Sequence, residues 1–291
     1  MFRKLLVTSL SVLGSFNNLS VLAADEVLLE RGAYLTEGIV ACGNCHTPKT
    51  ADAVPIESMQ FAGGFVIEEP AFKAYAPNIT MDKETGIGSW TDEEIVRSIR
   101  EGIRPDGTLI GPPMPFLNYR NISDRDVKAI VAYMRTIEPV KNVVPKSDYK
   151  IPLPPNWGPP VGNVAEVSKD DPLAYATYVA TTLGHCNACH TPMIHGEYDF
   201  NRTGMGGNRY VGIFGLKITT VSPNITSHKE LGIGNWTDDQ IKTAITDGIR
   251  PDGRMLAPAM GFPYYKNIDE EDMDALVLYI RSLKPQPAEC H

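Results

Sequence analysis

Two pairs of cysteines, each followed at once by a histidine, carry the clearest chemistry in this sequence. They are Cys42, Cys45 and His46 in the first half, and Cys186, Cys189 and His190 in the second. Two thiols three positions apart on one helical turn can each form a thioether with a vinyl group of haem, and the adjacent histidine can then ligate the iron. A redox-active pair does not need that histidine, and a zinc site needs further ligands. The motifs therefore predict two covalently bound haem c groups.

The two motifs belong to an internal repeat. His46 and His190 are 144 residues apart, and from there on matching segments lie 146 residues apart. The recurring segments are Pro-Asn-Ile-Thr at 77–80 and 223–226, Gly-Ile-Gly-x-Trp-Thr-Asp at 86–92 and 232–238, and Gly-Ile-Arg-Pro-Asp-Gly at 102–107 and 248–253. A period this long indicates duplicated domains, because solenoid repeats are much shorter.

The sixth iron ligand decides what such haems can do. The first half contains a single histidine, so its haem cannot have two histidine ligands from its own domain. Two methionine pairs recur at the repeat spacing, Met114 with Met260 and Met59 with Met205. Only the first pair has matching, proline-stiffened flanks that could hold a thioether toward iron. We therefore expect Met114 and Met260 to be the axial ligands, although core packing is the commoner role of a methionine.

Four recurring polar or aromatic residues are candidates for the haem propionates. Trp90 and Trp236 could donate their indole N–H to a partly buried carboxylate, helped by Asn78 and Asn224. The alternative for the tryptophans is simple packing beneath a loop. The Arg-Pro-Asp-Gly segments fit β-turns better than a propionate clamp, since proline stands second and glycine fourth.

We expect helices to position these residues. Thr91 and Thr237 each precede an apolar helical pattern and have Glu94 and Gln240 three positions on, which predicts capping boxes. Gly102 and Gly248 should end these helices. Further helices are expected from Ser123 and Asp269, and before each motif at 26–35 and 173–182. No segment alternates well enough to be a strand.

The start of the sequence and its composition predict where the protein is located and what kind of partner it binds. Residues 1–23, with Arg3 and Lys4 before an apolar stretch, predict a cleaved signal peptide and export to the periplasm. No other run reaches transmembrane length. The formal net charge of −8 argues against nucleic acid and favours a basic docking patch on a partner. We expect domains at 24–138 and 166–285, a proline-rich linker at 139–165 and a tail at 286–291.

Together, these motifs resemble the class I cytochrome c domains in the dihaem and trihaem subunits of bacterial alcohol, aldehyde and sugar-acid dehydrogenases. The resemblance spans roughly residues 27 to 284. It implies an all-α fold, with two tandem cytochrome c domains each wrapped around its haem. It also implies that the chain accepts electrons from a periplasmic dehydrogenase and passes them to a cytochrome or terminal oxidase. Those subunits often carry a third haem and a membrane-binding tail, for which this sequence shows no motif.

Two other readings remain open, and both are enzymes. A dihaem peroxidase also carries two such motifs, but one of its haems must open its distal side to peroxide. A thiosulfate dehydrogenase relies on a thiolate or histidine ligand at its catalytic haem. Both halves here keep the same methionine segment. We therefore expect an electron carrier in which one electron per haem moves by outer-sphere transfer, with no catalytic residue.

Overall fold

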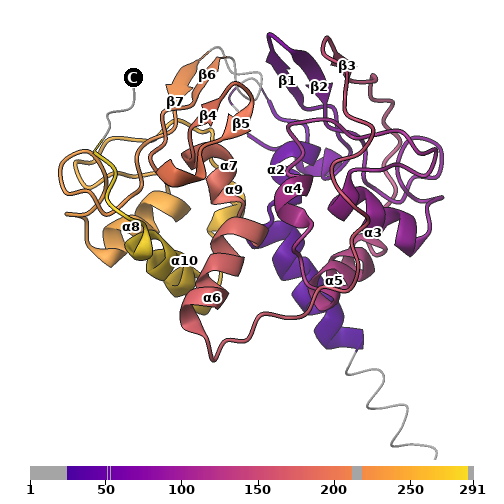
Figure 1. The fold of residues 1–291 in the computed structure, drawn as a ribbon. Coiled ribbons are helices and arrows are strands. Elements are labelled where there is room, and N and C mark those ends of the chain that lie inside the picture. The colour runs from indigo at the N-terminus through magenta and orange to yellow at the C-terminus, as the bar shows by residue number, and fades with distance from the viewer. Residues whose placement is uncertain (1–24, 51, 53, 212–217, 288–291) are drawn as a thin grey trace, which may run out of the picture.

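The computed structural model describes residues 25–50, 52, 54–211 and 218–287. The expected signal peptide and the fifth cysteine, Cys290, lie outside these residues. Two halves stand side by side and meet along helices from both (Figure 1). No helix in the described part of the chain is long and apolar enough to cross a membrane.

Helices predominate in both halves. The first half contains, after a helical stretch at 25–34, η1 (Leu35–Ile39), α2 (Cys42–His46), η2 (Glu57–Met59), α3 (Asp92–Glu101), α4 (Phe116–Tyr119) and α5 (Asp124–Met134). The second contains α6 (Pro172–Thr177), η3 (Tyr178–Leu183), α7 (Cys186–His190), η4 (Phe200–Arg202), α8 (Asp238–Thr246), α9 (Phe262–Tyr265) and α10 (Glu270–Ser282). The order of the helices around each motif is the same, as the repeat predicts.

Short strands also occur, so the expectation of an all-α chain without strands was wrong in this respect. They are β1 (Val66–Glu69), β2 (Phe72–Tyr75), β3 (Asp148–Tyr149), β4 (Met193–Ile194), β5 (Glu197–Tyr198), β6 (Arg209–Val211) and β7 (Thr219–Val221). They pair antiparallel as β1-β2-β3, β4-β5 and β6-β7. Strands of two to four residues are too short to show a readable alternation of polar and apolar side chains.

The capping residues confirm the predicted starts of the main helices. The Thr91 hydroxyl accepts the backbone N–H of Glu94 at 3.2 Å, and the Glu94 carboxylate accepts that of Thr91 at 2.8 Å. Thr237 and Gln240 repeat this box at α8. Ser123 and Asp269 cap α5 and α10. Helix α3 ends at Gly102 in the left-handed conformation, whereas α8 ends at Thr246, two residues before Gly248.

A single cluster of buried apolar residues runs through both halves. It includes Leu35 and Ile130 from the first and Val179 and Leu276 from the second, each at most 3% exposed. The two halves therefore share one core, and burial of this surface holds them together.

Buried polar groups cross the boundary between the halves in a nearly two-fold pattern. Tyr34 Oη donates to Asp272 at 2.7 Å, and its counterpart Tyr178 donates to Asp126 at 2.7 Å. Asp126 and Asp272 are 5% and 1% exposed. Arg31 breaks the symmetry, since its Nε donates to Asp126 at 2.9 Å and its guanidinium also lies 3.8 Å from Asp272. Each carboxylate thus has partners from both halves, since Tyr175 of the second half also donates to Asp272.

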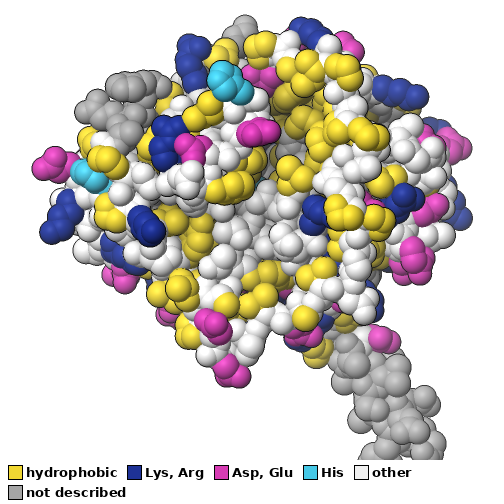
Figure 2. All heavy atoms as spheres, in the orientation of Figure 1, with side chains coloured by type: hydrophobic (Ala, Val, Ile, Leu, Met, Phe, Trp, Pro, Cys, Tyr) yellow, Lys and Arg dark blue, Asp and Glu magenta, His cyan; other side chains and the backbone are white. Residues whose placement is uncertain are grey.

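The proline-rich segment between the halves packs along the first half. Its β3 residues pair with β2, and the N–H and C=O of Val164 both bond to Asp124. Figure 2 shows hydrophobic side chains, prolines included, below the position of β3 where this segment descends. The expected linker is therefore anchored to one domain over much of its length.

Candidate haem sites

Each cysteine motif forms a short helix placed by the π-helix before it. Helix 25–34 runs into η1 and α6 runs into η3, and α2 and α7 follow. The residues just before the motifs, Ala41 and His185, take the left-handed conformation with φ of 52° and 40°. A π-turn followed by a left-handed residue changes the chain direction sharply, which sets the angle at which the motif enters. The His185 ring is tilted against that of Tyr119, with 5.7 Å between the ring centroids.

The two motif histidines are buried and oriented in the same way. His46 Nδ1 lies 2.8 Å from the carbonyl oxygen of Pro77, and His190 Nδ1 lies 2.9 Å from that of Pro223. This contact requires the proton on Nδ1, which leaves Nε2 as the nitrogen with a lone pair for iron. Burial lowers the pKa of both imidazoles, against the opposing effect of the carbonyl bond. Both rings are therefore neutral, as a metal ligand requires.

The thiols do not have the character of a redox-active pair. Burial raises the pKa of Cys42 to about 12 and that of Cys45 to about 11, and the pKa of Cys186 is raised to about 12. Catalytic and redox cysteines instead have a pKa below the ordinary value. None of the motif cysteines forms a disulfide. The paired thiols suit covalent attachment of a cofactor rather than thiol exchange.

The donor sets also fit haem better than a bare metal ion. In the described part of the chain, no three His, Cys, Asp or Glu side chains come together as a metal-binding group. One fixed imidazole beside two thiols is the set that a haem needs, because the porphyrin supplies the other ligands. The fit of both sites to haem c thus rests on residues that the structure brings together.

The methionine loops occupy equivalent places in the two halves. Met114 and Met260 directly precede the residues that lead into α4 and α9, and both are half-buried. Tyr149 Oη donates to the carbonyl of Pro112 at 2.9 Å and anchors the first loop. Of the competing pair, Met205 is 6% exposed and Met59 half-buried. Ligation by Met114 and Met260 stays a prediction.

Asn78 and Asn224 organise the loops beside the histidines. Each side-chain oxygen accepts two bonds, from the backbone N–H and the hydroxyl of Thr80 or Thr226. Asn78 Nδ2 donates to Thr85 and to the carbonyl of Val140, and Asn224 Nδ2 donates to that of Gln286. A propionate contact, which stays a prediction, would have to displace one of the Asn78 bonds.

The tryptophans are held through their backbones. Arg135 donates to the carbonyl of Trp90 and Arg281 to that of Trp236, both at 2.6 Å. The Arg250 guanidinium lies 5.4 Å above the Trp236 ring. Both rings are half-buried, and their contact with a propionate stays a prediction. The Arg-Pro-Asp-Gly segments are turns as expected, closed by Gly107 N–H to Arg104 O at 2.9 Å and by its counterpart.

Sequence reasoning missed two sets of residues at these sites. One is the pair of proline carbonyls, which the recurrence of Pro77 and Pro223 could have suggested. The other is the pair of tyrosines at equivalent positions, Tyr119 and Tyr265. Burial raises the pKa of both phenols, and the nearby motif thiols are a smaller cause.

The two motifs are close in space. Helix α2 packs against α9 of the second half, and η1 and η3, the π-helices that lead into the two motifs, pack against each other. In Figure 1, α2 and α7 both lie on the sides of their halves that face each other. A sequence separation of 144 residues thus becomes a short path across the boundary between the halves.

Family comparisons agree with the two halves. Residues 175–284 match the family model of cytochrome c, and residues 28–134 match that of subunit III of cbb3-type cytochrome c oxidase. Each matched range contains one of the motifs.

Similar proteins of known role cover nearly the whole chain. The cytochrome c subunit of alcohol dehydrogenase (quinone) from Gluconobacter oxydans is 29% identical over 91% of this chain and 56% of its own length. The gluconate 2-dehydrogenase cytochrome c subunit of Pantoea cypripedii is 28% identical over 99% and 66%. A diheme c-type cytochrome of Cereibacter sphaeroides is 26% identical over 82% and 81%. The chain thus spans between half and two thirds of the length of these two dehydrogenase subunits.

Proposed function

Because the chain is a c-type cytochrome that resembles the cytochrome c subunits of quinone alcohol and gluconate dehydrogenases, we propose that it carries electrons for such a dehydrogenase. The observation that supports this most is the matched pair of motif helices, each with a buried neutral histidine held by a proline carbonyl. Two such sites favour two covalently bound haem c groups, as in the diheme relative. Electrons enter from the dehydrogenase and leave to a cytochrome or terminal oxidase of the respiratory chain.

Each haem c supplies a one-electron iron couple. The chain contributes the thioether anchors, the proximal imidazole and, in this proposal, the thioether sulfurs of Met114 and Met260. Methionine is a soft ligand that stabilises the reduced state relative to histidine. Because one histidine and one methionine of the protein would hold each iron, no substrate would reach the metal, and the protein would act as a carrier and not as a catalyst.

The proposed compartment is the periplasm. The basic and then apolar start of the sequence supports export, and covalent attachment keeps the cofactor bound outside the cytoplasm. The packing of α2 against α9 and of η1 against η3 supports transfer between the two sites within one molecule.

The attachment sites can be tested by intact-protein mass spectrometry. We expect the mass of the purified protein to exceed that of the polypeptide by two haems. Replacing Cys42 and Cys45 together by Ala should remove one haem, and the same change at Cys186 and Cys189 should remove the other. Loss of both haems in either variant would contradict two independent sites, unless circular dichroism shows that the variant fails to fold.

The carrier role can be tested with purified components. Alcohol dehydrogenase or gluconate dehydrogenase, given its substrate, should reduce both haems of the oxidised protein, as followed by visible absorbance. Rapid binding of carbon monoxide by the reduced protein would instead show an open iron and favour a dihaem peroxidase or thiosulfate dehydrogenase.

A further inference from the structure

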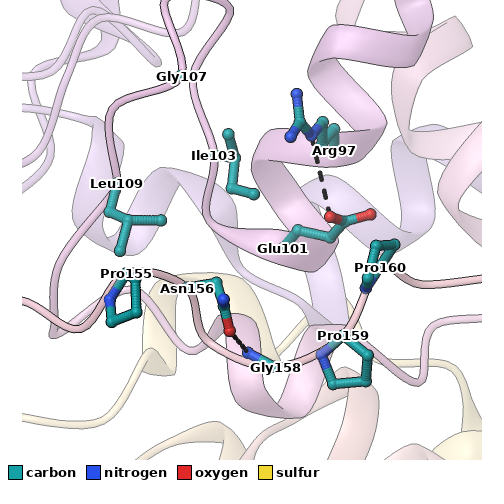
Figure 3. A pocket seen from close by; sticks show the side chains of 10 residues that line it. All are labelled: Arg97, Glu101, Ile103, Gly107, Leu109, Pro155, Asn156, Gly158, Pro159 and Pro160. Carbon is teal, nitrogen blue, oxygen red and sulfur yellow. Dashed lines mark hydrogen bonds and ion pairs between the residues drawn. The ribbon is translucent and has the colours of Figure 1, made fainter.

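The proline-rich segment covers a hollow on the first half whose counterpart on the second half is open. Residues 149–161, here called the strap, form one wall of a cavity of about 330 Å³. Figure 3 shows Pro155 to Pro160 on that wall, facing Arg97 and Glu101 of α3 and the loop that carries Ile103 and Leu109. The strap therefore lies over the surface formed by α3 and the Gly-Ile-Arg-Pro-Asp-Gly turn.

An aromatic anchor fixes the strap to this surface. The Trp157 ring lies 4.6 Å from that of Phe116, centroid to centroid. Its Nε1 donates to the carbonyl of Ile110 at 2.9 Å. A tryptophan that stacks on one side and donates at its edge is typical of recognition sites.

Two polar bonds hold the backbone of the strap. The N–H of Val161 donates to Glu101 Oε1 at 3.2 Å. The Arg120 guanidinium donates to the carbonyl of Pro159. The first half thus offers a carboxylate, a cation, a carbonyl and an aromatic ring to an extended segment.

All four groups recur in the second half at the repeat spacing of 146 residues. The counterparts are Asp247 for Glu101, Lys266 for Arg120, Leu256 for Ile110 and Phe262 for Phe116. A smaller cavity of about 130 Å³ adjoins this second surface, lined by residues of α8 and by Ile249 to Pro251. Its Thr243 and Ile249 are the counterparts of Arg97 and Ile103 in the first cavity. Each of the four groups that bind the strap in the first half thus has a counterpart in the second half.

Exposure shows that no described segment of the chain covers this second surface. Ile249 is 38% and Met255 68% exposed, whereas their counterparts Ile103 and Leu109 are half-buried. Asp247 and Lys266 are both exposed to solvent. The apolar side chains that the strap shields in one half therefore face water in the other.

We propose that this surface, here called the open groove, binds an extended proline-rich segment of a partner polypeptide. The groove comprises Asp247, Ile249, Met255, Leu256, Phe262 and Lys266. Phe262 and Met255 contact a tryptophan side chain of the partner. The backbone carbonyl of Leu256 accepts the indole N–H of that tryptophan. Asp247 accepts a backbone N–H and Lys266 donates to a carbonyl. Proline-rich segments suit this role because they are already extended and lose little entropy on binding. The proposal does not depend on electron transfer.

A peptide with the sequence of residues 150–162 serves as the probe, with isothermal titration calorimetry on the haem-loaded protein as readout. We expect saturable binding at one site. Met255→Asp should weaken it about tenfold or more, since it places a charge against the apolar partner. Leu278→Asp, at a 40% exposed position on α10, is the matched control and should bind normally. A peptide with alanine in place of tryptophan should bind about tenfold more weakly.

Absence of saturable binding, or equal affinity in Met255→Asp, would overturn the proposal. Dimers in sedimentation that disappear in Trp157→Ala would assign the open groove to the strap of a second copy, which would also overturn it. Visible spectra of the variants report the haems separately, so a failure here leaves the electron-carrier function untouched.

Discussion

At the scale of single residues, Met114 and Met260 have the greatest effect on function. If each ligates iron, Met114→Ala should lower the potential of one haem by on the order of 0.1 V, since methionine raises it. Met260→Ala should do the same to the other haem. Potentiometric titration followed by visible absorbance measures both.

Met59→Ala is the control, because Met59 belongs to the other pair at the repeat spacing. It should leave both potentials unchanged. Unchanged titration curves in Met114→Ala and Met260→Ala would refute the ligand assignment.

Gly88 is a second residue with a sharp expectation. A Cβ at this position would lie 2.0 Å from the carbonyl oxygen of Met81, so the backbone would have to move. We expect Gly88→Ala to lower the free energy of unfolding by about 2 kcal/mol. Chemical denaturation measures the change.

Gly162→Ala is the comparison, since a Cβ there meets nothing within 4 Å. Its stability should stay within about 0.5 kcal/mol of the parent. Similar losses in both variants would contradict the steric explanation.

At the scale of elements, the capping box of α3 contributes to stability through backbone groups that would otherwise lack partners. Thr91→Ala removes the acceptor for the Glu94 N–H and should cost about 1 kcal/mol. Thr91→Ser keeps the hydroxyl and should retain most of the stability. Denaturant unfolding distinguishes the two, and an equal loss in both would rule out the cap as the cause.

The motif helices α2 and α7 show how elements position chemistry. Each has only five residues and is too short to be stable by itself. The π-helix before it and the proline carbonyl that holds its histidine fix its place. The sequence predicts where these helices lie but not what supports them.

At the scale of the whole molecule, the tyrosine bonds across the boundary make the interface sensitive to alkali. Burial, with the charge of Asp272 second, raises the pKa of Tyr34 above its ordinary value of 10, and burial also raises that of Tyr178. Only the protonated phenol can donate, so this contribution to stability is complete below pH 10 and is lost as the pH rises above it. We expect the free energy of unfolding to fall above pH 10.

The double variant Tyr34→Phe with Tyr178→Phe tests this expectation. It should be less stable by about 3 kcal/mol at neutral pH, because two buried carboxylates lose a donor. It should also lose less stability above pH 10 than the parent does, as measured by denaturation at both pH values. Parallel pH curves for parent and variant would show that these tyrosines do not set the alkaline limit.

The sequence by itself determined the chemistry and the duplication. The cysteine–histidine motifs, the capping boxes at Thr91 and Thr237 and the starts at Ser123 and Asp269 are local patterns, and each depends on residues within a few positions of one another. Such patterns can be recognised in the sequence without knowledge of the fold. The strands were missed because they are not local patterns. A strand as short as Asp148–Tyr149 forms only by pairing with a segment that is distant in the sequence.

Only the tertiary structure showed which residues, distant in the sequence, contact each motif and the boundary between the halves. The bond from His46 to Pro77 joins residues 31 apart, and that from Tyr34 to Asp272 joins residues 238 apart. It also showed that the strap covers one half and leaves the matching groove of the other open. No local pattern specifies such contacts, because they arise only when burial of the shared core brings the two halves together.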